Sequence, residues 1–366
     1  MTYEDDIRAV ATLDIPWEKL SGCNILITGA TGLIGSCLVD VLMSRKNKAY
    51  NVYAAGRNEE RAMRKFKKYA DDKAFHFVKY DVTEPLTGDT SFHYIIHAAS
   101  NASPNFFANN PVEVIKANIY GVSNLMDYGL CHGTLRFLFV SSGEVYGEGD
   151  GRVFTEDYSG YVNPTSPRSC YPSSKRAAET LCVSYAEEYG MQTVIARPCH
   201  TYGPGFTEDD NRVYAQFIRN VLAGEDIVMK STGEQFRSWC YVVDCAAALL
   251  YILLKGENGH AYNIADESSN ITIKQLAEMI ASTGGKKVIR EIPSDAEQKG
   301  FNVVKKSVYS TDKLKDLGWK VEGTMEEKIK RTIERNISAN FCLLLAKPKL
   351  HLTPFLTHPH VYIYNV

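Results

Sequence analysis

The segment Asn24-Ile-Leu-Ile-Thr-Gly-Ala-Thr-Gly-Leu-Ile-Gly35 decides the fold. It starts with the apolar, β-branched character of a buried strand, and the apolar positions 34, 38, 41 and 42 have the spacing of a helix. Between strand and helix lie Gly29 and Gly32, where the lack of a Cβ lets the backbone turn sharply and a ligand approach it closely. The segment therefore predicts a strand, a tight turn and a helix.

This geometry suits the pyrophosphate of a dinucleotide, which binds the free N–H groups and the positive dipole end of a helix. Gly29 would allow the turn, Gly32 the close approach, and Gly35 the packing of the helix on the strand. The spacing is GxxGxxG, whereas the general fingerprint is GxGxxG. The residues expected to contact the dinucleotide here are Gly29, Thr31, Gly32, Leu33, Ile34 and Gly35.

The composition excludes several classes of protein. With 366 residues and a formal net charge of −2, the chain gives no reason to expect a nucleic acid or an anionic membrane as partner. The nine cysteines form no CxxC pair, which argues against a disulfide framework or a zinc site. No apolar run approaches the roughly 18 residues of a membrane span, and no signal peptide is evident. We expect a cytoplasmic, metal-free protein that forms a homodimer and acts on a small molecule.

Strands and helices alternate along the first half of the chain. Strands are expected at 51–58, 75–80, 94–100 and 135–141, and a helix carries apolar residues at 115, 119, 122 and 126. A basic helical stretch at 61–68 is interpreted as a solvated face. Such alternation predicts an α/β fold with a parallel, doubly wound sheet, which binds ligands at the carboxyl ends of its strands.

The ends of these strands carry the next cofactor candidates. Gly56 and Arg57 stand where an acidic residue would bind the adenosine ribose. Arg57 could hold the 2′-phosphate of NADP, since no carboxylate is expected nearby, or it could be a solvated arginine, so the choice of NAD or NADP stays open. The other candidates are Asp81, which could meet the adenine amino group, Val82, the small residues Ala98 and Ala99, and Asn118, which could also be structural.

Two segments carry the candidate chemistry. In Phe139-Val-Ser-Ser-Gly-Glu-Val-Tyr-Gly147 a strand ends in hydroxyl groups at the carboxyl edge of the sheet. In Pro167-Arg-Ser-Cys-Tyr-Pro-Ser-Ser-Lys175 the side chains of Tyr171 and Lys175 are four residues apart and share one face of a helix. A lysine ammonium at ~4 Å, in an effective dielectric of ~20, would favour the phenolate by roughly 4 kcal/mol, or about three pKa units before desolvation. Tyr171 could then take a proton from a sugar hydroxyl that Ser142 also holds.

Together, the glycine turn, the strand end at 141–147 and the Tyr171/Lys175 pair resemble the extended short-chain dehydrogenase/reductase family, over roughly residues 22–336. The resemblance implies that Ser142, Tyr171 and Lys175 are catalytic and that NAD or NADP is the cofactor. It also implies a Rossmann domain at 22–196 with a returning segment near 237–255, and a smaller mixed α/β domain, mainly 197–336, that binds a nucleotide sugar. Residues 1–21 are expected to form a helix and linker, and 337–366 a tail.

Within this family the pattern is similar to that of UDP-glucuronate decarboxylases, in the segments 156–171, 210–218 and 235–242. Arg168, three residues before Tyr171, could hold the substrate carboxylate, and Glu144, two positions beyond Ser142, could be an acid or base near C5. Arg237 is expected to pair with the diphosphate, a role that the whole family shares. Arg212 and His200 are further candidates for substrate binding, although the decarboxylases carry asparagine in place of His200. The implied mechanism is redox neutral and passes through a 4-keto sugar.

Other functions stay open. The 4,6-dehydratases share Glu144 but carry an aspartate where this chain has Gly143, which weakens that reading. A 4-epimerase needs no Arg168, and an NADP-dependent reductase would follow if Arg57 selects NADP. A dinucleotide-sensing binding protein without turnover is the non-enzymatic alternative. The tail histidines His351, His358 and His360 lack the spacing of a metal site.

Overall fold

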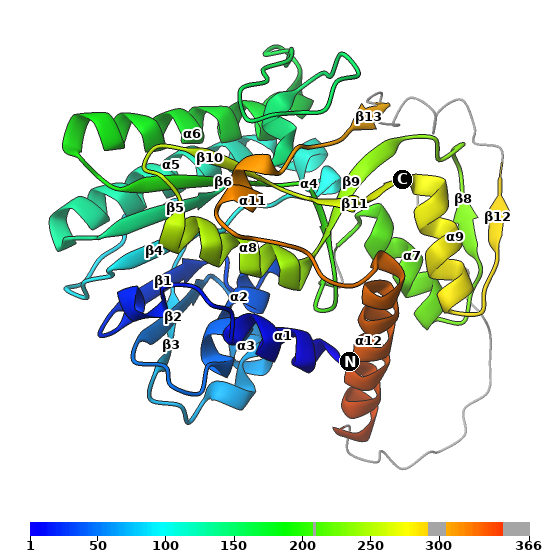
Figure 1. The fold of residues 1–366 in the computed structure, drawn as a ribbon, viewed down its shortest axis with the longest axis horizontal. Helices are drawn as coiled ribbons and strands as arrows, with labels where there is room; N and C mark the ends of the chain where they lie inside the picture. The colour runs from blue at the N-terminus through cyan, green and yellow to red at the C-terminus, as the bar shows by residue number, and fades with distance from the viewer. Residues whose placement is uncertain (208–209, 292–304, 347–366) are drawn as a thin grey trace.

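The computed structural model describes residues 1–207, 210–291 and 305–346. The larger part of the molecule is a parallel sheet covered by helices on both faces, and the smaller part lies beyond the carboxyl ends of its strands (Figure 1). The described residues contain no helix that is both long and apolar enough to cross a membrane.

The large sheet confirms the predicted doubly wound fold. Its strands lie in the order β10-β6-β5-β4-β1-β2-β3, and all neighbours are parallel. The order reverses between β1 and β4, and such a reversal leaves a crevice at the carboxyl ends of the two strands. The bounds are β1 Asn24–Thr28, β2 Asn51–Gly56, β3 Phe75–Lys79, β4 Tyr94–His97, β5 Arg136–Val140, β6 Thr193–Pro198 and β10 Ala261–Ile264.

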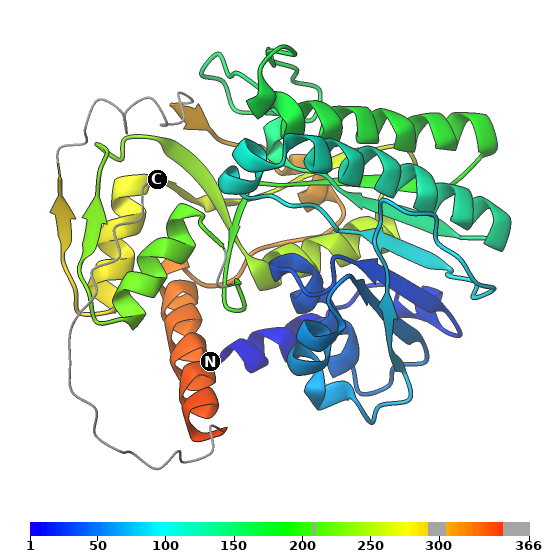
Figure 2. The ribbon, with the colours of Figure 1, turned by 180° about the vertical axis from the view of Figure 1, so that it is seen from behind.

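Helices α5 (Pro111–His132) and α6 (Cys170–Tyr189) lie together on one face of this sheet (Figures 1 and 2). Both end at a glycine in the left-handed conformation, Gly133 at φ 70° and Gly190 at φ 69°. The predicted buried face of α5 is confirmed at Val122 and Met126, which have no exposed surface. Nearer the start of the helix Ile115 is exposed, and Val114 and Asn118 are buried in its place.

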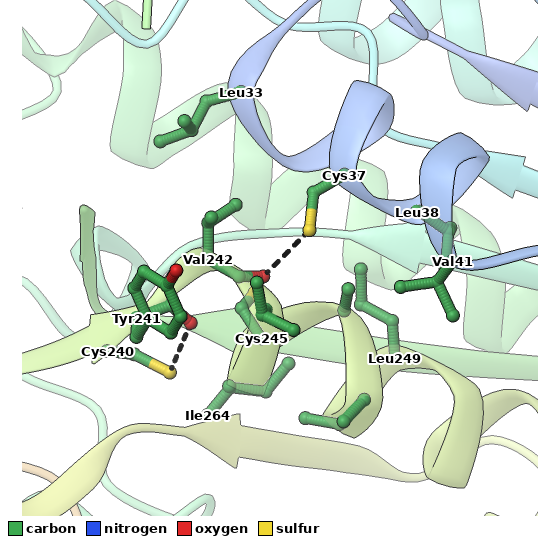
Figure 3. Packing of buried hydrophobic residues seen from close by; sticks show 14 of the residues in the cluster. Leu33, Cys37, Leu38, Val41, Cys240, Tyr241, Val242, Cys245, Leu249 and Ile264 are labelled. Atoms are coloured by element: carbon green, nitrogen blue, oxygen red, sulfur yellow. Dashed lines mark hydrogen bonds between the residues drawn. The ribbon is translucent and has the colours of Figure 1, made fainter. Parts of the chain in front are cut away.

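Helices α2 (Leu33–Ser44) and α8 (Val242–Lys255) pack against each other on the opposite face. Figure 3 shows Leu38 and Val41 of α2 beside Leu249 of α8, all without exposed surface. The Cys37 thiol donates to the Val242 carbonyl at 3.6 Å. Cysteine therefore acts here as a small apolar residue, and among the described side chains the cysteines are free.

The smaller part contains two small sheets and helices α7 (Val213–Leu222) and α9 (Ile273–Thr283). The short helix α11 (Asp312–Asp316) packs on β10 and α8 of the large part. One sheet comprises β7 (His200–Tyr202), β9 (Phe236–Tyr241), β11 (Asp266–Thr272) and β13 (Lys306–Ser307), and the other β8 (Ile227–Met229) and β12 (Val288–Arg290). Of the segment expected to return to the first domain, α8 packs on the large sheet whereas β9 belongs to a small one. The chain stays with the large sheet beyond residue 255, the predicted end of the returning segment, because β10 is the edge strand of that sheet. The domain boundaries themselves stay a prediction.

The terminal helices α1 (Tyr3–Ala11) and α12 (Met325–Ala346) contact each other. α12 runs past residue 337, so the predicted tail begins inside a helix. The three tail histidines lie outside the described residues. Arg331 of α12 pairs with Asp6 of α1 at 2.8 Å, and Lys328, 2% exposed, pairs with Asp244 of α8 at 2.7 Å. These ion pairs join both terminal helices to the large domain.

Replacing Lys328 by Met should lower the free energy of unfolding by about 3–5 kcal/mol, because it leaves the carboxylate of Asp244 buried without its cation. The double variant Lys328→Met/Asp244→Leu should recover most of this loss. Urea unfolding followed by fluorescence measures both effects. Lys330→Met on the exposed side of α12 is the control, and an equal loss in that variant would contradict the role of the buried pair.

Candidate active site

A cavity of about 960 Å³ lies at the carboxyl edge of the large sheet, between the glycine turn and the small sheet around β7. It gathers the predicted dinucleotide residues apart from Asn118, together with most of the predicted chemical ones. The predicted catalytic and substrate-binding residues in the lining are Ser142, Glu144, Tyr171, Lys175, His200 and Arg212. Arg168 and Arg237 are not among the lining residues.

The glycine turn has the geometry that a dinucleotide requires. Gly29 has φ +66°, and a Cβ on it would lie 2.6 Å from the carbonyl oxygen of Ala98. A Cβ on Gly35 would lie 2.9 Å from Cα of Ala30. Gly32 precedes α2 and provides no side-chain cap, so the first N–H groups of α2 remain available to an anion in the cavity. The three glycines thus stand where the predicted roles require them.

Arg57 is not far from a carboxylate, contrary to the prediction. Its Nη1 lies 3.7 Å from Oδ2 of Asp81, and both residues line the cavity. Burial raises the pKa of Asp81, but hydrogen bonds from Thr83 and the charge of Arg57 outweigh it, so the net pKa is lowered. The cause is the register of β2 and β3, in which Gly56 lies opposite Lys79, so the residues after the two strands meet. A 2′-phosphate at Arg57 would be repelled by Asp81.

Asn118 is fully buried and joins two helices. Its Nδ2 donates to Oγ of Ser174 at 2.9 Å, which fastens α5 to α6. Because Asn118 is absent from the cavity lining, the structure supports its structural interpretation and not a direct contact with a cofactor.

Tyr171 and Lys175 project from the first turns of α6 into the cavity. The Tyr171 ring stacks on Phe107 of α4 (Pro104–Asn109), with 4.7 Å between ring centres. The Lys175 ammonium donates to the Val140 carbonyl at 2.8 Å and lies 5.8 Å from the centre of the Tyr171 ring. The shared helix face therefore brings the pair together as predicted.

The electrostatic part of that prediction is wrong for the protein by itself. Burial, followed by the charge of Glu144, raises the pKa of Tyr171, while a hydrogen bond with Ser142 and the charges of two arginines oppose the rise. Burial also lowers the pKa of Lys175 to about 7. Desolvation penalises both charged forms, and here it outweighs the attraction between the ammonium and the phenolate. Lys175 alone therefore does not make Tyr171 acidic.

Ser142, Glu144 and Arg168 meet where β5 ends. The Ser142 hydroxyl accepts a hydrogen bond from the Glu144 amide at 3.2 Å, which starts the 3₁₀ turn Gly143–Tyr146. Nη2 of Arg168 contacts both carboxylate oxygens of Glu144 at 2.9 Å, and its guanidinium lies over the Phe107 ring at 4.7 Å. The two residues predicted to act on the substrate acid are therefore paired, and Glu144 brings Arg168 to the edge of the cavity.

The remaining predicted residues surround the end of the cavity near β7. Arg212 is paired with Asp210 at 2.6 Å. His200 begins β7 with its side chain open to the cavity, where desolvation and then the charges of Arg237 and Arg212 lower its pKa. Arg237 of β9 is 5% exposed; burial lowers its pKa, while Tyr309 and Glu144 act in the opposite direction. At this end of the cavity Arg212 and His200 line the wall, and the charge of Arg237 acts on His200 from behind it.

Two residues for which the sequence predicted no role lie at or beside the cavity. Tyr309 is among the lining residues. Lys65 lies in the basic stretch interpreted as solvated, yet its ammonium donates to the carbonyls of Thr31 at 3.2 Å and Gly205 at 3.1 Å, and burial lowers its pKa to about 8. Among the described residues, no group of three or more His, Cys, Asp or Glu is placed to hold a metal.

Comparison with known proteins agrees with this geometry. Residues 25–265 match the model of the NAD dependent epimerase/dehydratase family. The chain is 35% identical to UDP-glucuronic acid decarboxylase 6 of Arabidopsis thaliana over 90% of its own length and 92% of that protein's. It is 32% identical to UDP-glucuronic acid decarboxylase 1 of Xenopus tropicalis, over 84% and 71%.

Among solved structures, the UDP-glucose 4-epimerase of Thermotoga maritima with UDP-glucose superimposes with a TM-score of 0.72 at 26% identity. The match covers 87% of this chain and 99% of the epimerase. Since the family model spans most of the chain and the Arabidopsis relative aligns over 92% of its length, the chain belongs to the NAD dependent epimerase/dehydratase family.

Proposed function

We propose that this protein decarboxylates UDP-glucuronate to UDP-xylose, with NAD as its cofactor. The observation that carries the proposal is the meeting of Tyr171 and Ser142 with the Glu144–Arg168 pair beyond the glycine turn. The curated relatives at 31–36% identity that bear the name UDP-glucuronic acid decarboxylase support the same reaction.

The chain's own groups fit a dinucleotide. The uncapped N-terminus of α2 offers N–H groups to the pyrophosphate, and Asp81 would repel a 2′-phosphate, which favours NAD over NADP. Oxidised NAD held there would bring the positive charge of its nicotinamide ring to the cavity and would supply the acceptor, and later the donor, of the C4 hydride. That positive charge would favour the phenolate of Tyr171, which burial disfavours in the protein alone.

The proton steps use Tyr171 and Ser142. Tyr171 takes the proton of the C4 hydroxyl as the hydride leaves, and Ser142 donates a hydrogen bond to the same oxygen. Lys175, held by the Val140 carbonyl, supplies a donor below the cofactor site. When the hydride returns to C4, Tyr171 gives the proton back, so the enzyme ends in its starting state.

Decarboxylation follows from the ketone at C4. The sugar acid is then a β-keto acid: the bond between C5 and the carboxyl carbon breaks, carbon dioxide leaves, and the electron pair passes into the C4 enolate. C5 then takes a proton, for which Glu144 is the nearest predicted acid. Both contacts of Arg168 with Glu144 use Nη2, so the guanidinium can turn its other edge to the substrate carboxylate before the bond breaks.

A 4-epimerase is the second candidate, since a UDP-glucose 4-epimerase shares the fold over nearly its whole length. The two are separated by incubating the purified protein with NAD and either UDP-glucuronate or UDP-glucose. Carbon dioxide with a UDP-pentose is expected from the first. Conversion of UDP-glucose alone would overturn the decarboxylase, and no turnover of any nucleotide sugar would favour the dinucleotide-sensing protein. A homodimer and a cytoplasmic location stay predictions.

Tyr171→Phe should lower kcat by about 10²–10⁴-fold, because it removes the group that takes and returns the C4 hydroxyl proton. The ring and its stacking on Phe107 are kept, so NAD should bind as before. Release of carbon dioxide under saturating UDP-glucuronate measures the first effect and calorimetric titration with NAD the second. Activity within threefold of the wild type would contradict the assignment.

Asp81→Asn should reduce the preference for NAD over NADP by about tenfold, or ~1.4 kcal/mol, because it removes the negative charge beside Arg57. Dissociation constants of both dinucleotides, from fluorescence titration, measure the preference. Asp72→Asn, whose carboxylate pairs with Lys48, serves as the control. A wild-type protein that binds NADP as tightly as NAD would contradict the repulsion by Asp81.

A further inference from the structure

Tyr309 is held rigidly at the end of the cavity. It follows β13, and its segment forms a backbone bridge with Phe154, which accepts from the Ser310 amide at 2.9 Å and donates to the Val308 carbonyl at 2.7 Å. The Tyr309 amide also donates to the Ser238 hydroxyl at 3.2 Å. The ring packs against Phe154 with 5.5 Å between ring centres and is 3% exposed. The position of its hydroxyl is therefore fixed by the surrounding structure.

The hydroxyl of Tyr309 occupies the space that a side chain at position 143 would need. A Cβ built on Gly143 would collide with the hydroxyl and would lie 2.5 Å from Cζ of the Tyr309 ring. Position 143 lies between Ser142, which is expected to hold the oxygen on C4, and Glu144, which is expected near C5. Between Ser142 and Glu144, the space of a side chain at position 143 is therefore filled by the phenol of Tyr309, which comes from a distant segment.

The phenol is suited to donate a hydrogen bond. Burial raises the pKa of Tyr309, so the group keeps its proton at neutral pH. Its oxygen lies 2.6 Å from the Ser307 hydroxyl, which can donate to it and leave the phenolic proton for another acceptor. The charge of Arg237, which lies outside the cavity lining, also acts on Tyr309 and would favour a negatively charged oxygen beside the phenol.

We propose that Tyr309 contacts the substrate: its hydroxyl donates a hydrogen bond to the oxygen carried by C6 of the sugar. The inference rests on the proposed function for the orientation of the sugar, with C4 at Ser142 and Tyr171. C6 is attached to C5, so it lies beyond C4 on the side of Glu144, where the Tyr309 hydroxyl replaces a side chain at 143. A carboxylate and a hydroxymethyl group both offer this oxygen, whereas a pentose does not.

Tyr309→Phe tests the contact, because it removes the oxygen and keeps the ring. The dissociation constants of UDP-glucuronate and UDP-glucose should rise about tenfold or more, and that of UDP-xylose, which has no C6, should change less than twofold. Calorimetric titration in the presence of NADH measures all three without turnover. Tyr158→Phe, in the same aromatic cluster but outside the cavity lining, is the control.

An equal change for all three sugars, or none, would overturn the role of Tyr309. Failure of the proposed decarboxylation would appear separately, as absence of carbon dioxide with the wild-type protein, and would leave the binding comparison interpretable because UDP-glucose also carries an oxygen on C6.

A second set of variants tests whether the Tyr309 hydroxyl occupies the space of a side chain at position 143. With Tyr309→Ala, the chain should accept Gly143→Ser, which puts a hydroxyl back into the same place, and should recover part of the lost affinity for UDP-glucuronate. Gly143→Ala in the same background adds only a methyl group and should recover none. In the wild type, Gly143→Ala should lower the melting temperature, and the effect should vanish with Tyr309→Ala. If the effects of Gly143→Ala and Tyr309→Ala on the melting temperature were additive, the two positions would not share this space.

Discussion

The close approach of two backbones, the glycine turn after β1 and the end of β4, determines where everything in this site lies. A Cβ on Gly29 would meet the carbonyl of Ala98, so the two strands on either side of the topological reversal can approach only because this position is bare. With the turn held at this place, the first turn of α2 faces the cavity. The end of β5 and the start of α6 supply Ser142, Tyr171 and Lys175 at the same edge of the sheet. The arrangement of the catalytic residues therefore depends on the absence of a side chain at Gly29.

The sequence predicted the part of the fold that is local in the chain. Each strand of the Rossmann sheet up to residue 141 and the helix after the glycine turn follow from apolar runs with a clear period. The return of β10 to the edge of the sheet could not be read in this way, because its partner β6 lies far earlier in the chain. The buried positions in the first half of α5 were missed because one of them is polar: Asn118 lies in the core, where its amide donates to Ser174.

In the site, residue types and their order along the chain were predictable, but their environment was not. Tyr171 and Lys175 share a helix face, as spacing alone requires, yet the direction in which the pKa of Tyr171 moves depends on burial, which no local pattern reports. Arg57 and Asp81 meet because β2 and β3 are neighbours in register. Tyr309 left only an indirect sign in the sequence, the bare position at Gly143, because a missing side chain does not say which distant residue replaces it.

Lys65 connects regions that would serve different halves of the bound molecules. One ammonium binds the carbonyl of Thr31 in the glycine turn and the carbonyl of Gly205 in the loop after β7. A displacement of that loop must therefore either break a bond to a desolvated cation or pull on the turn itself. The position of this loop and the shape of the glycine turn therefore depend on each other through a single side chain.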